Sequence, residues 1–155
     1  MEIEIRLATA ADHAALGHVM YEAVRHSASP YTEAQRQAWM PEPRSGAEWD
    51  ARLGAQTVLV ATQGEEIVGF MSLAAEGYID FAYIRPAAQG QGIFRRLYEE
   101  IEALARERGG TRLWVHASLM AQPAFAAMGF VVTQPETVAV RGQSLDRFAM
   151  EKVLS

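Results

Sequence analysis

The sequence predicts an α/β fold of the α+β kind, in which helices cover a twisted mixed sheet. Three observations support this prediction. Residues 3–7 alternate apolar and polar side chains, as a half-buried strand does. Residues 78–84 are rich in β-branched and aromatic side chains, and a glycine-bearing turn then leads into apolar residues at helical spacing. Near the C-terminus, two strand-like segments meet at Arg141 and Gly142.

The first third of the chain is expected to form one strand followed by three helices. Side chains that can cap a helix stand before each helical segment, and breaks occur near residues 26, 40 and 54. The expected capping pairs are Thr9 with Asp12, Thr32 with Gln35, and Ser45 with Glu48.

The remaining elements follow from the same patterns. A Gln-Gly-Glu-Glu turn at 63–66 separates two strand-like runs. Ile93, Leu97, Ile101 and Leu104 recur on one helical face, which ends at Gly109. The expected elements are strands over 57–62, 67–74 and 78–84, a helix from 93 to about 109, a strand over 113–116, a helix over 120–128, and two strands around 141–143.

Composition limits the functional classes. At 155 residues, with half of them hydrophobic, the chain is expected to form one domain over 1–155. The net charge is −5 and no run of Lys or Arg occurs, which argues against nucleic-acid binding. The acidic balance slightly favours a cationic or neutral partner.

The chain has no cysteine, which excludes disulfides, thiolate metal sites and a cysteine nucleophile. No metal-binding motif is present, so we expect no metal. No apolar run is long enough to span a membrane, and the acidic start is unlike a signal peptide. These features predict a cytoplasmic protein.

The turn over 89–94 is the strongest functional signal. A glycine turn between a strand and a helix directs backbone N–H groups at one point, at the positive end of the helix dipole, and such a point binds phosphate. A dinucleotide fingerprint would need a third glycine where Arg95 stands, and no Walker Gly-Lys-Ser/Thr follows. Arg95 and Arg96 stand in the first turn of the expected helix, where their positive charges interact unfavourably with the helix dipole. A polyanion bound at the same end of the helix would make this interaction favourable.

The turn resembles the pyrophosphate loop of the GNAT superfamily of N-acetyltransferases, whose pattern is Gln/Arg-x-x-Gly-x-Gly/Ala. Gln89 and Gly92 match the pattern, and Phe94 replaces its last small residue. Gly129 and Phe130 match the family's later Gly-Phe pair. The resemblance extends from Ile3 to about Lys152 and implies the GNAT fold, with a mostly antiparallel sheet of about seven strands and about four helices.

The resemblance also implies acetyl-CoA as co-substrate. Backbone N–H groups of the loop would hold the pyrophosphate, the strand before it would pair with the pantetheine, and Phe125 would pack against the cofactor. The implied cofactor-binding residues are Ala82, Tyr83, Ile84, Gln89, Gly90, Gln91, Gly92, Ile93, Phe94, Arg95 and Phe125.

The catalytic residues are less directly indicated. The position at which many family members carry a tyrosine acid is Phe125, which has no proton to give. We therefore expect His116 to act as base, oriented by Asp80, with Ser118 bonding the pantetheine or the thiolate. The alternative is structural: His116 would cap a strand end, and Asp80 would bond neighbouring backbone.

The acceptor is expected to be the amine of a small molecule, or less readily a peptide, which attacks the thioester directly. Tyr31, Trp39 and Tyr78 are expected to form aromatic walls of its pocket. A homodimer is compatible with this prediction. Two alternatives stay open: a non-catalytic acyl-CoA-binding module, for which Phe94 and Phe125 argue, and a phosphate-binding regulatory domain that does not bind CoA.

Overall fold

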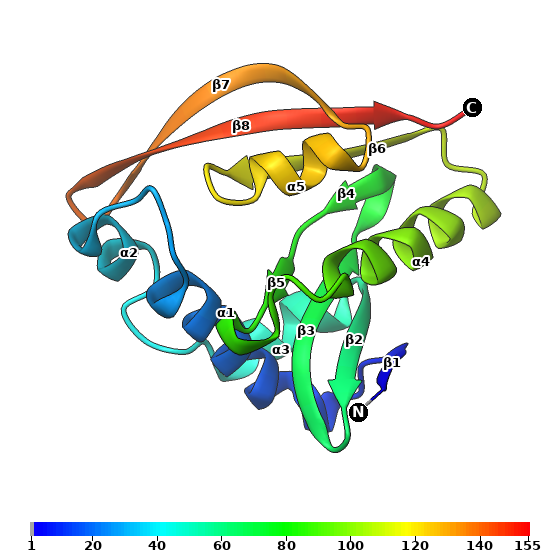
Figure 1. The fold of residues 1–155 in the computed structure, drawn as a ribbon, viewed down its shortest axis with the longest axis horizontal. Helices are drawn as coiled ribbons and strands as arrows, with labels where there is room; N and C mark the ends of the chain where they lie inside the picture. Colours follow the sequence, from blue (N-terminus) through cyan, green and yellow to red (C-terminus); the bar gives the residue numbers. More distant parts are fainter. Residues whose placement is uncertain (1) are drawn as a thin grey trace.

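The computed structural model describes residues 2–155, which form five α-helices and eight strands (Figure 1). The helices are α1 (His13–His26), α2 (Glu33–Trp39), α3 (Ala47–Gly54), α4 (Ile93–Glu107) and α5 (Gln122–Ala127). The strands are β1 (Ile3–Leu7), β2 (Thr57–Gln63), β3 (Glu66–Leu73), β4 (Tyr78–Ile79), β5 (Ala82–Ile84), β6 (Arg112–Ser118), β7 (Val131–Val140) and β8 (Gln143–Val153).

The strands form two sheets of four rather than one sheet of about seven. The first has the order β1-β2-β3-β5 and the second the order β4-β6-β8-β7. All pairs are antiparallel except β4 with β6. The predicted mixed, mostly antiparallel α+β architecture is therefore confirmed, and the division between the sheets agrees with the splayed strands that the family resemblance implies.

The division occurs inside the segment predicted as one strand over 78–84. Tyr78 and Ile79 pair in parallel with β6, whereas Ala82–Ile84 pair antiparallel with β3. Between them, Asp80 leaves the ladder and binds Arg52 of α3. Beyond this point β5 and β6 belong to different sheets and diverge, which leaves a gap between two strand edges.

The core lies on both faces of the first sheet. Phe70 and Val60 pack with α1 and α3, whereas Met71 and Ala61 pack with α4 and the second sheet. Strands β2 and β3 are buried on both faces, which explains their nearly continuous apolar sequence.

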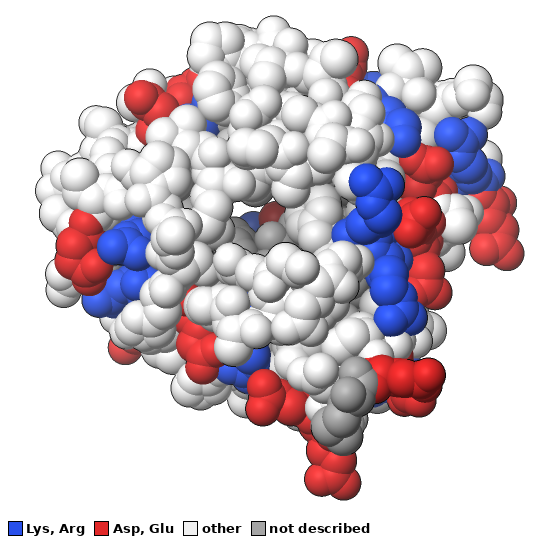
Figure 2. All heavy atoms as spheres, in the orientation of Figure 1, with Lys and Arg blue, Asp and Glu red and all other residues white. Residues whose placement is uncertain are grey.

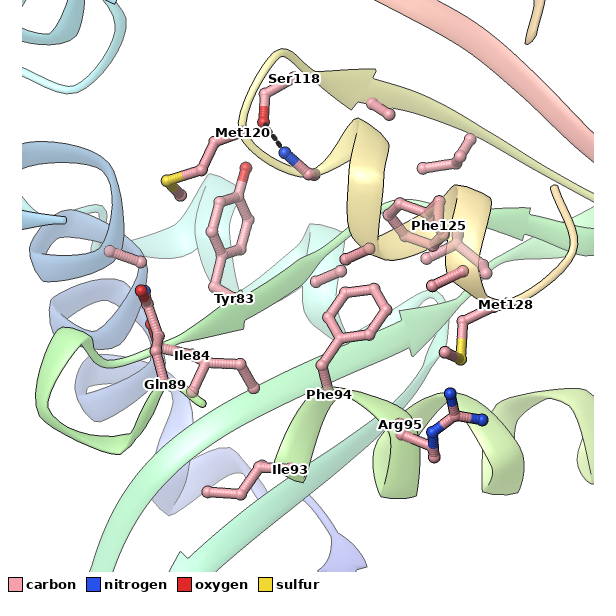
Figure 3. Close-up of a pocket in the computed structure, with 18 of the residues that line it drawn as sticks. Tyr83, Ile84, Gln89, Ile93, Phe94, Arg95, Ser118, Met120, Phe125 and Met128 are labelled. Atoms are coloured by element: carbon pink, nitrogen blue, oxygen red, sulfur yellow. Dashed lines mark hydrogen bonds between the residues drawn. The ribbon is translucent and has the colours of Figure 1, made fainter. Parts of the chain in front are cut away.

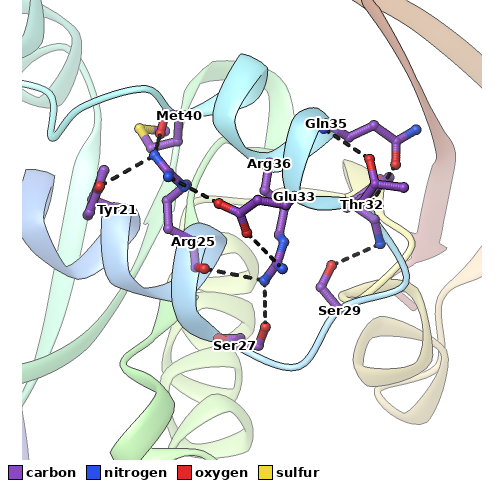
Figure 4. Close-up of polar contacts among 10 residues, drawn as sticks. Tyr21, Arg25, Ser27, Ser29, Thr32, Glu33, Gln35, Arg36 and Met40 are labelled. Carbon is purple, nitrogen blue, oxygen red and sulfur yellow. Dashed lines mark hydrogen bonds and ion pairs between the residues drawn. The ribbon is translucent and has the colours of Figure 1, made fainter.

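Ion pairs fix α2 against the end of α1 (Figure 4). Glu33 accepts from Arg25 and from Arg36 at 3.2 Å in each case. Arg25 also donates to the Met40 carbonyl at 3.1 Å, and Arg36 to that of Ser27 at 3.0 Å. These contacts fix the position of Trp39, which ends α2.

Two of the three expected caps are confirmed. Asp12 accepts from the Thr9 N–H at 2.7 Å, and a short 3₁₀ turn then leads into α1. At α2, Thr32 and Gln35 form the reciprocal capping box. The expected cap by Ser45 is wrong: the residue before α3 is Gly46, whose φ of +93° favours glycine and which provides no side-chain cap.

Within residues 2–155, no helix is both long and apolar enough to cross a membrane. The same residues contain no cluster of three or more His, Asp or Glu side chains suited to hold a metal ion.

Candidate active site

A cavity of about 400 Å³ occupies the gap between β5 and β6 (Figure 3). In the space-filling view the molecule is hollowed near its centre, and Lys and Arg atoms lie beside the hollow, over the start of α4 (Figure 2). The cavity extends from the first turn of α4 to the end of β6, with α5 as one wall. All the residues assigned to the cofactor from the sequence line it except Gln91, which is exposed.

The loop before α4 presents free backbone donors to this cavity. Gly90 and Gly92 have φ of +79° and +78°, and a Cβ built on either would meet no atom within 4 Å. The first helical bond is donated by Arg96 to the Gly92 carbonyl, so the N–H groups of the preceding turn have no helical acceptor. No side chain caps this end of α4. The geometry suits an anion such as a pyrophosphate.

Gln89 holds the loop in place. Its side-chain amide donates to Ser27 Oγ at 2.8 Å and to the Ile84 carbonyl at 3.0 Å. The matched position of the motif therefore links the loop to the end of α1 and to β5. Its side chain is already bonded within the protein, so we interpret Gln89 as support for the phosphate loop.

Phe94 occupies its position without blocking the loop. Its ring packs edge-on against Phe125, with ring centroids 5.1 Å apart. Phe125 in turn packs on Phe130 and is 1% exposed. The two departures from the family pattern, Phe94 and Phe125, are thus partners in one aromatic contact that forms part of the cavity wall (Figure 3).

Arg95 and Arg96 have different surroundings. Arg95 lines the outer end of the cavity beside Met128 (Figure 3). Arg96 donates to the Ile3 carbonyl at 2.8 Å and so links α4 to β1. The shared phosphate role expected for the pair is therefore not supported for Arg96.

We expect Arg95→Ala to weaken CoA binding several-fold, with a smaller loss at high salt, because screening hides the contribution of an exposed cation. Arg96→Ala should instead lower the stability of the free protein by about 0.5–1 kcal/mol, since it removes one exposed hydrogen bond. Calorimetric titration with CoA and urea unfolding of both variants test this separation. Equal effects of the two variants on both measurements would contradict it.

Asp80 does not orient His116. The Asp80 carboxylate accepts from Arg52 at 2.7 and 2.9 Å and from Gln56 at 2.9 Å. Burial alone would raise the pKa of Asp80, but these hydrogen bonds outweigh it and hold the pKa below its usual value. Asp80 lines the cavity as an ionised group that Arg52 already neutralises, so the expected Asp80–His116 pair is wrong.

The partner of His116 is Glu136 of β7. The His116 Nδ1 lies 2.9 Å from Glu136 Oε1, and the same oxygen accepts from Arg147 at 2.9 Å. Desolvation would raise the pKa of Glu136, but the Arg147 hydrogen bond and the nearby imidazole lower it. His116 lines the cavity, and with Nδ1 bonded to Glu136 its Nε2 has no hydrogen-bond partner among residues 2–155.

Ser118 also lines the cavity, at the end of β6. Its hydroxyl accepts from the Ala121 N–H at 3.1 Å in the turn before α5. The hydroxyl proton remains free to be donated, because this contact uses only a lone pair.

Tyr83 was expected to bind the cofactor, but the sequence analysis gave no role to its hydroxyl. The ring rises from β5 into the cavity, and the hydroxyl points towards Ser118 and Met120 (Figure 3). Burial raises the pKa of Tyr83, so the phenol stays protonated at neutral pH. The sequence did contain a signal for this residue. A tyrosine stands in the strand before the loop, and Phe125 occupies the position at which the family resemblance implies a tyrosine acid.

The three expected acceptor-pocket aromatics lie in different places. Trp39 lines the cavity. Tyr31 is buried beside it, where its hydroxyl donates to the Asp146 carbonyl and accepts from the Leu119 N–H at 3.0 Å. Tyr78 stacks on Trp114 and meets the His116 ring edge-on at 5.7 Å. Tyr31 and Tyr78 therefore support the walls rather than form them.

Comparisons with known proteins agree with this geometry. A family model described as an acetyltransferase (GNAT) domain matches residues 27–153. The chain is 30% identical over 149 residues to YafP, an uncharacterised N-acetyltransferase of Escherichia coli K12, covering 96% of this chain and 94% of that protein.

Solved structures are similar over almost the whole chain. The GCN5-related N-acetyltransferase from Rhodopseudomonas palustris superposes with a TM-score of 0.90 at 32% identity, covering 99% of this chain and 97% of that one. The phosphinothricin acetyltransferase from Sinorhizobium meliloti, in complex with acetyl-CoA, has a TM-score of 0.75 at 21% identity, covering 100% of this chain and 90% of that one.

Proposed function

Because the chain belongs to the GNAT family of acetyltransferases, we propose that it transfers the acetyl group of acetyl-CoA to the amine of a small molecule by direct attack. The observation that carries this proposal is the continuous cavity from the first turn of α4 to His116, between the edges of β5 and β6. It offers one binding point for a pyrophosphate and one for a reacting thioester.

The cofactor fits this cavity in two respects. The N–H groups at the start of α4 have no helical acceptor and no side-chain cap, so they are able to donate to a pyrophosphate. Strand β5 is the edge of the first sheet, so Ala82 and Ile84 are suited to pair with the amides of a pantetheine as an added strand would.

His116 acts as the base in this proposal. An amine with a pKa near 10 is almost entirely protonated at pH 7, so a proton must leave before attack. His116 Nε2 takes that proton, and Glu136 on Nδ1 stabilises the imidazolium that results. The amine nitrogen forms a bond to the carbonyl carbon, the bond from carbon to sulfur breaks, and sulfur keeps the electron pair.

The Tyr83 hydroxyl donates a hydrogen bond that stabilises the departing thiolate in this scheme. The second proton lost by the acetylated nitrogen ends on the sulfur as the thiol forms. The hydroxyl takes the place of the acid that Phe125 does not provide, from the opposite wall of the cavity. Ser118 is a second hydroxyl at the same end. Asp80 keeps Arg52 in place and takes no proton.

We expect Tyr83→Phe to lower kcat by about 10- to 100-fold while the KM for acetyl-CoA changes little, as loss of one hydrogen-bond donor to developing negative charge does. Tyr21→Phe makes the same chemical change outside the cavity and should be neutral. Steady-state kinetics of both variants check this. A Tyr83→Phe variant with normal kcat would remove the tyrosine from the scheme.

The function itself is tested by thiol release from acetyl-CoA in the presence of a panel of small amines, with mass spectrometry of the products. The proposal requires amine-dependent thiol release and a product carrying one acetyl group. Tight CoA binding without turnover of any amine would favour the non-catalytic acyl-CoA-binding alternative.

A further inference from the structure

A second cavity, of about 610 Å³, adjoins the first and is lined by the cation of Arg44. It lies between the end of α2, the segment over 40–46, α3 and the turn between β7 and β8. Trp39 lines both cavities. Arg52 lines the second cavity and binds Asp80, which lines the first. This ion pair therefore forms part of the boundary between the two cavities.

Three arginines line this second cavity, and two of them have acceptors. Arg52 is paired with Asp80, and Arg141 donates to the Ala38 carbonyl at 2.7 Å. Arg44 is half-buried, and within residues 2–155 its guanidinium has no hydrogen-bond acceptor and no carboxylate within ion-pair distance. The pKa of Arg44 is lowered by burial and by the neighbouring Arg52 cation.

The carboxylates of this cavity do not supply the missing partner. Glu42 and Glu48 are both exposed, and neither forms an ion pair with a described residue. Solvent still reaches the Arg44 guanidinium, so an anion that enters the cavity can replace this water with charge-assisted hydrogen bonds. Arginine presents a planar fork of N–H donors that matches a carboxylate or phosphate in two parallel bonds.

The backbone at Arg44 is held firmly. Gly17 of α1 lies against the Arg44 carbonyl, and a Cβ at position 17 would be 2.0 Å from that oxygen. The Arg44 guanidinium also faces the Trp49 ring at 6.0 Å. Besides burial, the nearby Arg52, which binds Asp80 of the first cavity, lowers the pKa of Arg44. The unpaired cation is therefore fixed near the end of the site where the amine reacts.

We propose that the acceptor is an amine that also carries an anionic group, which Arg44 binds in the second cavity while the amine reaches the first. This inference rests on the proposed function, since it specifies the acceptor of the same site. It assigns Trp39 a place between the two ends of that acceptor. Carboxylate and phosphate share the chemistry that Arg44 recognises.

The test uses matched probes with and without the anionic group: amino acids of two to six carbons, their carboxamides, and the corresponding aminoalkyl phosphates. Affinity is measured by calorimetry with the CoA complex, and kcat/KM with acetyl-CoA. Wild-type protein should prefer at least one anionic series over the carboxamides by about 10-fold or more, as a charge-assisted bond implies. In Arg44→Gln that preference should fall to about 1, and Arg44→Lys should keep part of it.

Arg108→Gln is the matched control, because it removes an arginine that lines neither cavity and should leave the preference unchanged. Equal affinity of wild-type protein for anionic and neutral probes, or an unchanged preference in Arg44→Gln, would overturn the inference. Selective binding of an anionic probe, lost in Arg44→Gln, without turnover of any amine would uphold the anion site and contradict the proposed function instead. Intact CoA affinity shows that the Arg44 variants are folded.

Discussion

Gly92→Asp abolishes CoA binding while the protein stays folded, if the loop before α4 holds the pyrophosphate. At φ +78° and with no atom within 4 Å of a built Cβ, position 92 accepts a side chain without a clash. A non-glycine residue in this left-handed conformation costs about 1–2 kcal/mol, least for Asp and Asn. The carboxylate would face the free N–H groups at the start of α4 and occupy the place of the phosphate.

The control for this substitution is Gly92→Asn, which has nearly the same shape and backbone tolerance but no charge. We expect calorimetry to show no CoA binding by Gly92→Asp and a reduced but measurable affinity for Gly92→Asn. Circular dichroism melts of both free variants should be alike. Wild-type CoA affinity in a folded Gly92→Asp variant would rule out the loop as the phosphate site.

His116→Ala should lower kcat by about 100-fold or more without a comparable change in acetyl-CoA affinity, as loss of a general base does. His116 is the histidine that lines the cavity, and Glu136 fixes its ring through Nδ1. Steady-state kinetics with a saturating amine measure the effect. His18→Ala removes an exposed histidine of α1 and serves as the control.

A near-normal kcat for His116→Ala would show that the proton leaves by another route. Asp80→Asn would then be the informative variant, because Asp80 is the carboxylate that lines the cavity, although Arg52 already binds it. A loss of activity in both variants combined with loss of CoA binding would indicate damage to the fold rather than to the chemistry.

The strand, turn and helix that form the proposed phosphate loop could be predicted because these elements are local in sequence. A strand, a glycine turn and an amphipathic helix follow each other within about 30 residues, a length typical of such units. The helix appeared as Ile93–Glu107, and the capping box at Thr32 and Gln35 also formed. Both depend on contacts between residues a few positions apart.

The His116–Glu136 pair could not be predicted in this way. Glu136 lies on β7, and β8 separates that strand from β6. A register shift between Val132 and Gln134 determines which β7 residue stands opposite each residue of β8. A shift of one residue would turn the side chains of β7 to the other face, so the pairing depends on a bulge that the sequence does not reveal.

The break at Asp80 was missed for a similar reason. Residues 78–84 have the composition of one strand, and local propensity gives no sign that Asp80 binds Arg52 of α3. Yet this break separates the sheets and opens the cavity. The net charge of −5 favoured a cationic or neutral acceptor, whereas the anionic group that we propose for the acceptor follows from the position of Arg44 alone.

The most direct test of the central claim is a crystal structure of the protein with acetyl-CoA. We predict that the pyrophosphate contacts the backbone N–H groups at the start of α4, and that the thioester lies between β5 and β6 within reach of Tyr83 and His116. Acetyl-CoA bound elsewhere, or a thioester outside this cavity, would contradict the account.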